Sequence, residues 1–148
     1  MAEAAASLRR LGGALLDALL PPHCLTCEAP VAAQGAMCPD CFGRLSFVTA
    51  PLCTRCGVPF AHEGEGPCCS DCAARPPAYR AARAALRYDD GARALILPFK
   101  HRDRTELAGP LARHMARAGA ELLARAELIA PVPLHWRRLL ARRHNQAA

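Results

Sequence analysis

Eight of the nine cysteines of this 148-residue chain form four Cys-x-x-Cys pairs within one stretch of 49 residues. The pairs are Cys24/Cys27, Cys38/Cys41, Cys53/Cys56 and Cys69/Cys72. Ten residues separate the first pair from the second, and twelve separate the third from the fourth. This spacing is typical of tetrathiolate zinc ribbons, in which a tight turn presents two thiolates and a hairpin returns the other two. We expect these eight cysteines to bind two zinc ions in a small zinc-ribbon β module.

The second set of cysteines repeats the first. The segment 24–30 parallels 53–59 at an offset of 29 residues, and Cys38 corresponds to Cys69 at an offset of 31. Such a repeat favours two stacked ribbons that each close their own site. In the alternative, a cross-brace, the first and third pairs share one ion and the second and fourth share the other. Cys68 is an alternative ligand, although the Cys-x-x-Cys spacing favours Cys69.

Disulfides are the alternative use of so many cysteines, and they require an oxidising compartment. Residues 1–20 do not form a secretory signal, because Asp17 interrupts the apolar run and no cleavage site follows it. The segment is also too short to span a membrane. Its leucines have helical spacing, so we expect an amphipathic helix over 1–20. The prediction is a cytoplasmic protein with reduced thiols and bound zinc, with an iron–sulfur cluster as the alternative.

Charge is distributed unevenly along the chain. Residues 21–72 contain five acidic and two basic residues, whereas residues 73–148 contain six acidic and fifteen basic residues. A zinc ribbon that grips nucleic acid needs a basic face, so the acidic first segment favours a structural role for the zinc sites. Nucleic-acid binding, if it occurs, is expected in the basic second segment.

The second segment has the pattern of an α/β unit. Alternating residues predict a strand over 81–88, followed by a turn or helix cap at 89–91 and a helix over 92–97 that Pro98 interrupts. A second helix is predicted to open at Thr105, with four apolar residues on one face: Leu107, Leu111, Met115 and Leu122.

The apolar run 127–134 is of the buried-strand type, and a basic loop then enters a helix after His135. A parallel sheet needs neighbouring strands, and none follows this run. We therefore expect an incomplete α/β domain over residues 78–148, and we interpret the chain as truncated.

Several motifs together resemble the ComF family, which has an amino-terminal double zinc ribbon and a type I phosphoribosyltransferase-like domain. They are the four cysteine pairs, Ala94-Leu95-Ile96 with Lys100, Pro131-Val132-Pro133-Leu134, Arg137-Arg138 and Asn145-Gln146-Ala147. The resemblance implies a double ribbon over 21–75. It also implies that phosphoribosyl pyrophosphate or a related phosphate ligand binds in the full-length protein, at His135, Arg137, Arg138 and Lys100. The alternative for these cations is a solvated basic helix face.

The chain also departs from this family. The acidic pair and Thr-Thr-Gly loop that hold ribose and phosphate have no counterpart, so we expect no transferase activity from this chain alone. The resemblance implies a role in DNA uptake during natural competence. Single-stranded DNA and a helicase or other DNA-uptake protein are the expected partners. The alternative is a nucleic-acid-binding or protein-interaction module without enzymatic activity.

Overall fold

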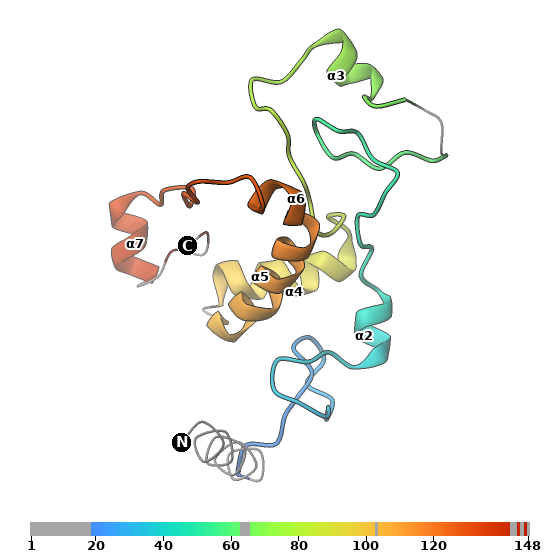
Figure 1. The fold of residues 1–148 in the computed structure, drawn as a ribbon. Helices are drawn as coiled ribbons and strands as arrows, with labels where there is room; N and C mark the ends of the chain where they lie inside the picture. Colours follow the sequence, from blue (N-terminus) through green and yellow to red (C-terminus); the bar gives the residue numbers. More distant parts are fainter. Residues whose placement is uncertain (1–18, 63–65, 103, 143–144, 146, 148) are drawn as a thin grey trace, which may run out of the picture. The chain divides into compact units, whose positions relative to one another are not determined.

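The computed structural model describes residues 19–62, 66–102, 104–142, 145 and 147. The chain divides into two compact units, Met1–Arg44 and Leu45–Ala148. Each unit contains one of the two cysteine sets. Figure 1 shows the helices of the chain, coloured along the sequence. The helix predicted over 1–20 lies outside the described residues, apart from its last two positions. No helix in the described part of the chain is both long and apolar enough to cross a membrane.

The ribbon of the first unit is a pair of turns followed by a short helix, α2 (Pro39–Gly43). The backbone N–H of Cys24 donates to the carbonyl of Ala29 at 2.7 Å, and a single antiparallel bridge joins His23 to Pro30. Cys38 is the N-cap residue of α2. The helix therefore begins directly after the third cysteine of the set and carries the fourth.

The ribbon of the second unit repeats this arrangement. The N–H of Cys53 donates to the carbonyl of Val58 at 2.9 Å, a bridge joins Leu52 to Pro59, and Cys69 caps α3 (Ser70–Ala74). The expected β module is wrong in detail, because no strand forms among the residues that the structure describes. A proline occupies one side of each bridge and has no N–H to extend a ladder.

The strand predicted over 81–88 is also absent. Its pairing is limited to three residues on each side, with a bridge between Phe47 and Leu86. The N–H of Arg87 donates to the Ser46 carbonyl at 2.8 Å, and the N–H of Val48 donates to the Ala85 carbonyl at 3.1 Å. This short antiparallel contact joins the start of the second unit to the segment that precedes its first long helix.

Helix α4 (Asp90–His101) follows this contact. The predicted cap is confirmed, because the Asp89 carboxylate accepts a hydrogen bond from the Ala92 N–H at 3.0 Å. The predicted interruption at Pro98 is wrong. Proline lacks an N–H for the helical ladder, but its carbonyl still accepts from the Arg102 N–H at 2.8 Å. The helix therefore continues for a further turn.

The second predicted helix begins as expected but divides into three elements: η1 (Thr105–Leu107), α5 (Ala108–Ala118) and α6 (Ala120–Leu123). Leu107 is fully buried, and with Ala92 and Leu95 of α4 it forms the small core of the helical region. The single predicted apolar face is wrong in part, because Met115 is 67% exposed. Gly119 separates α5 from α6. Because of this break, Leu122 does not continue the helical face of Leu111 and Met115.

The apolar run 127–134 is neither buried nor a strand. It is irregular, Leu128 is 83% exposed and Ile129 is 74% exposed. Periodicity identified an apolar segment, but a strand needs partners for its backbone, and the described residues provide none for this run. Helix α7 (Trp136–Arg142) follows the run. The α/β expectation is therefore not met in the described residues.

Candidate metal centres

The first cysteine set converges on one point. The sulfurs of Cys24, Cys27, Cys38 and Cys41 all lie within 4.8 Å of one another. The Cys27 and Cys38 sulfurs are 3.6 Å apart, and the Cys38 N–H donates to the Cys24 sulfur at 3.3 Å. Cys24 and Cys41 are buried. Two turns and the first turn of α2 thus present four thiol groups to a common centre.

The second set repeats this geometry with Cys53, Cys56, Cys69 and Cys72, again within 4.8 Å of one another. The Cys56 and Cys69 sulfurs are 3.7 Å apart, and the Cys69 N–H donates to the Cys53 sulfur at 3.4 Å. The sulfurs are therefore grouped sequentially along the chain, and the cross-braced grouping is not adopted. All nine cysteines are free thiols.

Both clusters fit a tetrahedral zinc ion. Zn–S bonds of about 2.3 Å place neighbouring sulfurs of a tetrahedron about 3.8 Å apart, close to the separations observed here. The backbone N–H groups that point at one sulfur in each cluster stabilise a thiolate. A bound zinc ion would supply the positive charge that allows all four closely spaced sulfurs to ionise.

The pKa values within each cluster are split. Burial disfavours the Cys24 thiolate, but N–H groups of Cys27, Cys38 and Thr26 outweigh burial and lower the pKa of Cys24 from 9.0 to about 6. The Cys69 N–H is the main cause that lowers the pKa of Cys53 to about 5.

The last cysteine of each set shows the opposite shift. Burial, followed by the neighbouring cysteine side chains, raises the pKa of Cys41 and of Cys72 to about 12. In each cluster the first cysteine thus has a stabilised thiolate, whereas burial favours the thiol form of the last cysteine.

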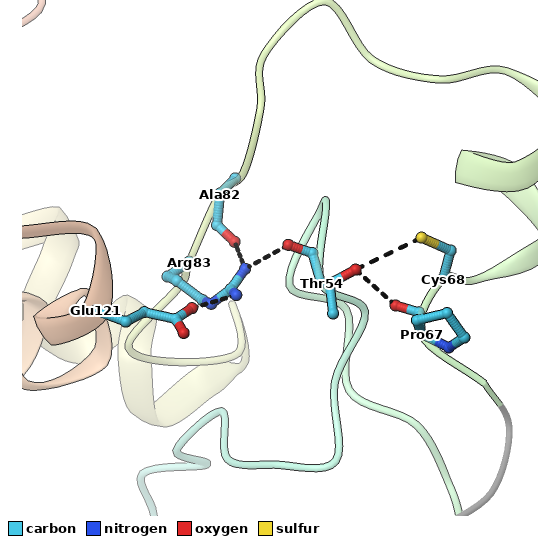
Figure 2. A network of polar contacts seen from close by, with 6 residues as sticks. All are labelled: Thr54, Pro67, Cys68, Ala82, Arg83 and Glu121. Atoms are coloured by element: carbon cyan, nitrogen blue, oxygen red, sulfur yellow. Dashed lines mark hydrogen bonds and ion pairs between the residues drawn. The ribbon is translucent and has the colours of Figure 1, made fainter. Parts of the chain in front are cut away.

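Cys68 lies outside the second cluster. Its sulfur is 3.5 Å from the Thr54 hydroxyl, which also donates to the Pro67 carbonyl at 2.8 Å (Figure 2). The structure therefore groups Cys69, and not Cys68, with the other three sulfurs.

The predicted ligand-binding cations lie on helices α4 and α7 or, in the case of His135, directly before α7. Lys100 is exposed in the last turn of α4. His135, Arg137 and Arg138 are exposed at the start of α7, where the His135 ring nitrogen accepts from the Arg137 N–H at 3.3 Å. The Arg137 guanidinium lies 5.2 Å from the centre of the Trp136 ring.

Asn145 forms a hydrogen bond to the Pro-Val-Pro segment that precedes His135. Its side-chain amide donates to the Val132 carbonyl at 3.2 Å and thereby joins the Pro-Val-Pro segment to the residues after α7. Two parts of the family-like motif, 131–134 and 145–147, are therefore in direct contact.

Sequence reasoning missed the polar network around Arg83. The Arg83 guanidinium donates to the carbonyls of Thr54 and Ala82, at 3.1 and 2.7 Å, and forms an ion pair with Glu121 of α6 (Figure 2). Its side chain is only 12% exposed. The network joins the second ribbon to the helical region. The sequence gives no indication of this network, because Arg83 is one of many arginines in its segment.

Comparison with known proteins supports the assignment of the cysteine clusters. The family model for the double zinc ribbon domain matches residues 15–74. The chain is 31% identical over 130 residues to the DNA utilization protein YhgH of Salmonella typhimurium strain LT2, covering 80% of this chain and 56% of that protein. The chain thus spans about half the length of this curated relative. No solved structure matches the chain.

The match over residues 15–74 and the two sets of converging sulfurs agree with each other. Four thiol ligands at tetrahedral spacing favour zinc over the other divalent metals. The two four-cysteine clusters are those of a double zinc ribbon and are consistent with two zinc ions, one in each cluster.

Proposed function

We propose that this chain is part of a ComF-type protein that acts in the uptake or use of DNA. The observation that carries the proposal is its 31% identity over 130 residues to a DNA utilization protein, an alignment that extends well beyond the cysteine-rich segment. The basic composition of residues 73–148 is consistent with a DNA-related role.

In this proposal the eight clustered cysteines bind zinc for a structural purpose. Each ion takes four protein ligands, so no coordination position is open for a substrate. The zinc ions hold the turns of each ribbon together in the absence of regular strands among the described residues. We expect the protein to act in a reducing compartment such as the cytoplasm, because its thiols must be available to the metal.

We further propose that residues 78–148 are the first part of a type I phosphoribosyltransferase-like domain, preceded by the double ribbon over 21–75. Lys100, His135, Arg137 and Arg138 would then bind phosphoribosyl pyrophosphate or a related phosphate ligand. Exposed cations and the Asn145 contact to Val132 support this placement.

The proposed partners are single-stranded DNA and a helicase or another DNA-uptake protein. The direct test is deletion of the gene in its host, with uptake and use of exogenous DNA as readouts. The proposal predicts a loss of DNA uptake or use that the complete gene restores. Unchanged uptake and use in the deletion strain would contradict it.

The phosphate-binding role has its own test. Arg137→Gln combined with Arg138→Gln in the full-length protein should weaken phosphoribosyl pyrophosphate binding, measured by calorimetry. The same change at Arg113 and Arg117, which lie on α5, is the matched control. Equal binding by all three proteins would exclude this placement of the ligand.

A further inference from the structure

A cavity of about 680 Å³ lies beside the second ribbon, and no cysteine of the zinc site is among its lining residues. It is lined by Thr54, Arg55, Arg80, Ala81, Arg83, Glu121, Leu122 and Arg125. Four of these eight residues are arginines, and one is acidic. The cavity is therefore strongly cationic, although the ribbon segment as a whole is acidic.

The walls of the cavity are held by hydrogen bonds between segments far apart in the sequence. The Ala82 N–H donates to the Arg55 carbonyl at 2.6 Å, and Arg83 contacts the Thr54 carbonyl on one side and Glu121 on the other (Figure 2). Because Glu121 is paired with Arg83, the one carboxylate of the lining is already neutralised. The positive charge of the other arginines remains.

We call Arg55, Arg80 and Arg125 the cavity arginines. All three side chains are exposed, and in the part of the chain that the structure describes none of them forms an ion pair. They come from the ribbon, the linker after it and the residues after α6. Their convergence on one cavity places like charges together, an arrangement that an anionic ligand would stabilise.

The repeat shows that Arg55 is particular to this ribbon. The two residues between the first cysteines are Leu25-Thr26 in the first ribbon and Thr54-Arg55 in the second. Leu25 is buried, whereas Thr54 and Arg55 are exposed and line the cavity. Of the two corresponding turns, only the one that lines the cavity thus contains an arginine.

We propose that the cavity arginines bind phosphate groups. Guanidinium groups bind phosphate oxygens through paired hydrogen bonds, and the volume suits a ligand of nucleotide size better than a single ion. Single-stranded DNA is the source of phosphate that we favour, and that choice rests on the proposed function.

The test measures binding of labelled oligothymidylate to the zinc-loaded chain across a range of salt concentrations. Changing all three cavity arginines to Gln should reduce the slope of log affinity against log salt by about 2, because each phosphate contact on a single strand contributes about 0.7. The matched control changes Arg87, Arg113 and Arg117 to Gln. These are exposed arginines of the same unit outside the cavity.

Zinc content and circular dichroism verify that both variants are folded. A second arm measures pyrophosphate binding directly by calorimetry and so identifies the source of the phosphate. Binding of pyrophosphate but not DNA, lost only in the cavity variant, assigns the site to a small phosphate ligand. Equal loss in the cavity and control variants, or no binding of either ligand to the original chain, would overturn the proposal. Both results are independent of the deletion phenotype, which tests the proposed function.

Discussion

The two zinc ribbons have nearly the same metal-binding geometry but different surroundings. Each has a sulfur–sulfur contact of 3.6 to 3.7 Å, an N–H of its third cysteine donated to its first cysteine sulfur, and a short helix after its third cysteine. The first belongs to a unit that ends at Arg44, whereas the second shares its unit with the basic helical region. The two ribbons thus have matching ligand geometry, but only the second is in the same compact unit as the helices.

One backbone position shows the difference most clearly. The residue after the second cysteine has a positive φ in both ribbons, 63° at Glu28 and 74° at Gly57. A Cβ atom at Gly57 would lie 2.7 Å from the Ala82 carbonyl oxygen, so the second ribbon requires glycine for space as well as for conformation.

Loss of a zinc ligand is the change with the largest expected effect, and it should separate the two ribbons. Cys24→Ser and Cys53→Ser should each reduce the zinc content from two ions per chain to one, as measured by atomic emission. Because the second ribbon shares its unit with the helices, only Cys53→Ser should also lower the unfolding temperature of the helical region. Two ions retained in either variant would contradict the assignment of ligands.

Gly57→Ala should have the next largest effect. Strain at positive φ and the contact with the Ala82 carbonyl should together destabilise the second unit by about 3 kcal/mol in urea unfolding. The matched change in the first ribbon is Glu28→Gly, which relieves strain but increases the entropy of the unfolded chain, and should stabilise it by about 0.5 kcal/mol. Changes of equal size and opposite sign at the two positions would show that the Ala82 contact is unimportant.

The ion pair between Arg83 and Glu121 should contribute less. A double-mutant cycle with Arg83→Gln and Glu121→Gln should give a coupling energy of about 1 kcal/mol, because Glu121 is half exposed and its charge is screened by solvent. Arg83→Gln alone should have a larger effect than Glu121→Gln, since it also removes donors to two carbonyls. A coupling energy of zero would show that the ion pair does not stabilise the packing of the second ribbon against α6.

The smallest effect concerns Asp89, the cap of α4. The Ser46 side chain, followed by the Ala92 N–H, lowers the pKa of Asp89 below its ordinary value of 3.8. A lowered pKa stabilises the folded state above pH 3.8, and this contribution is lost as pH falls through the folded value. Asp89→Asn should therefore reduce the acid dependence of unfolding, measured by urea unfolding at a series of pH values. An unchanged acid dependence in Asp89→Asn would contradict this role of the carboxylate.

The metal centres could be predicted from sequence because their determinants are local. Cys-x-x-Cys spacing specifies a tight turn, and the repeat favours sequential grouping of the eight cysteines. The cap at Asp89 was predicted for the same reason. These features depend on residues that are close together along the chain.

The predictions that were wrong, and the contacts that were not predicted, depend on residues far apart in the sequence. The run around Leu128 has the apolar pattern of a strand, but pattern alone does not provide the neighbours that bury it. Arg83 and Gly57 act through contacts with residues far away along the chain, and nothing in their local sequence indicates those contacts. The cavity arginines likewise come from three separate segments.

The second zinc ribbon supports the linker and the helical region of its own unit. The most direct measurement is hydrogen exchange at the Ala82 amide, which donates to the Arg55 carbonyl. In the Cys53→Ser variant, which keeps zinc only in the first ribbon, this amide should exchange at least about tenfold faster than in the original chain. The reason is that zinc no longer stabilises the turn that contains its acceptor, the Arg55 carbonyl. In Cys24→Ser its exchange should not change. Equal protection in both variants would contradict the claim.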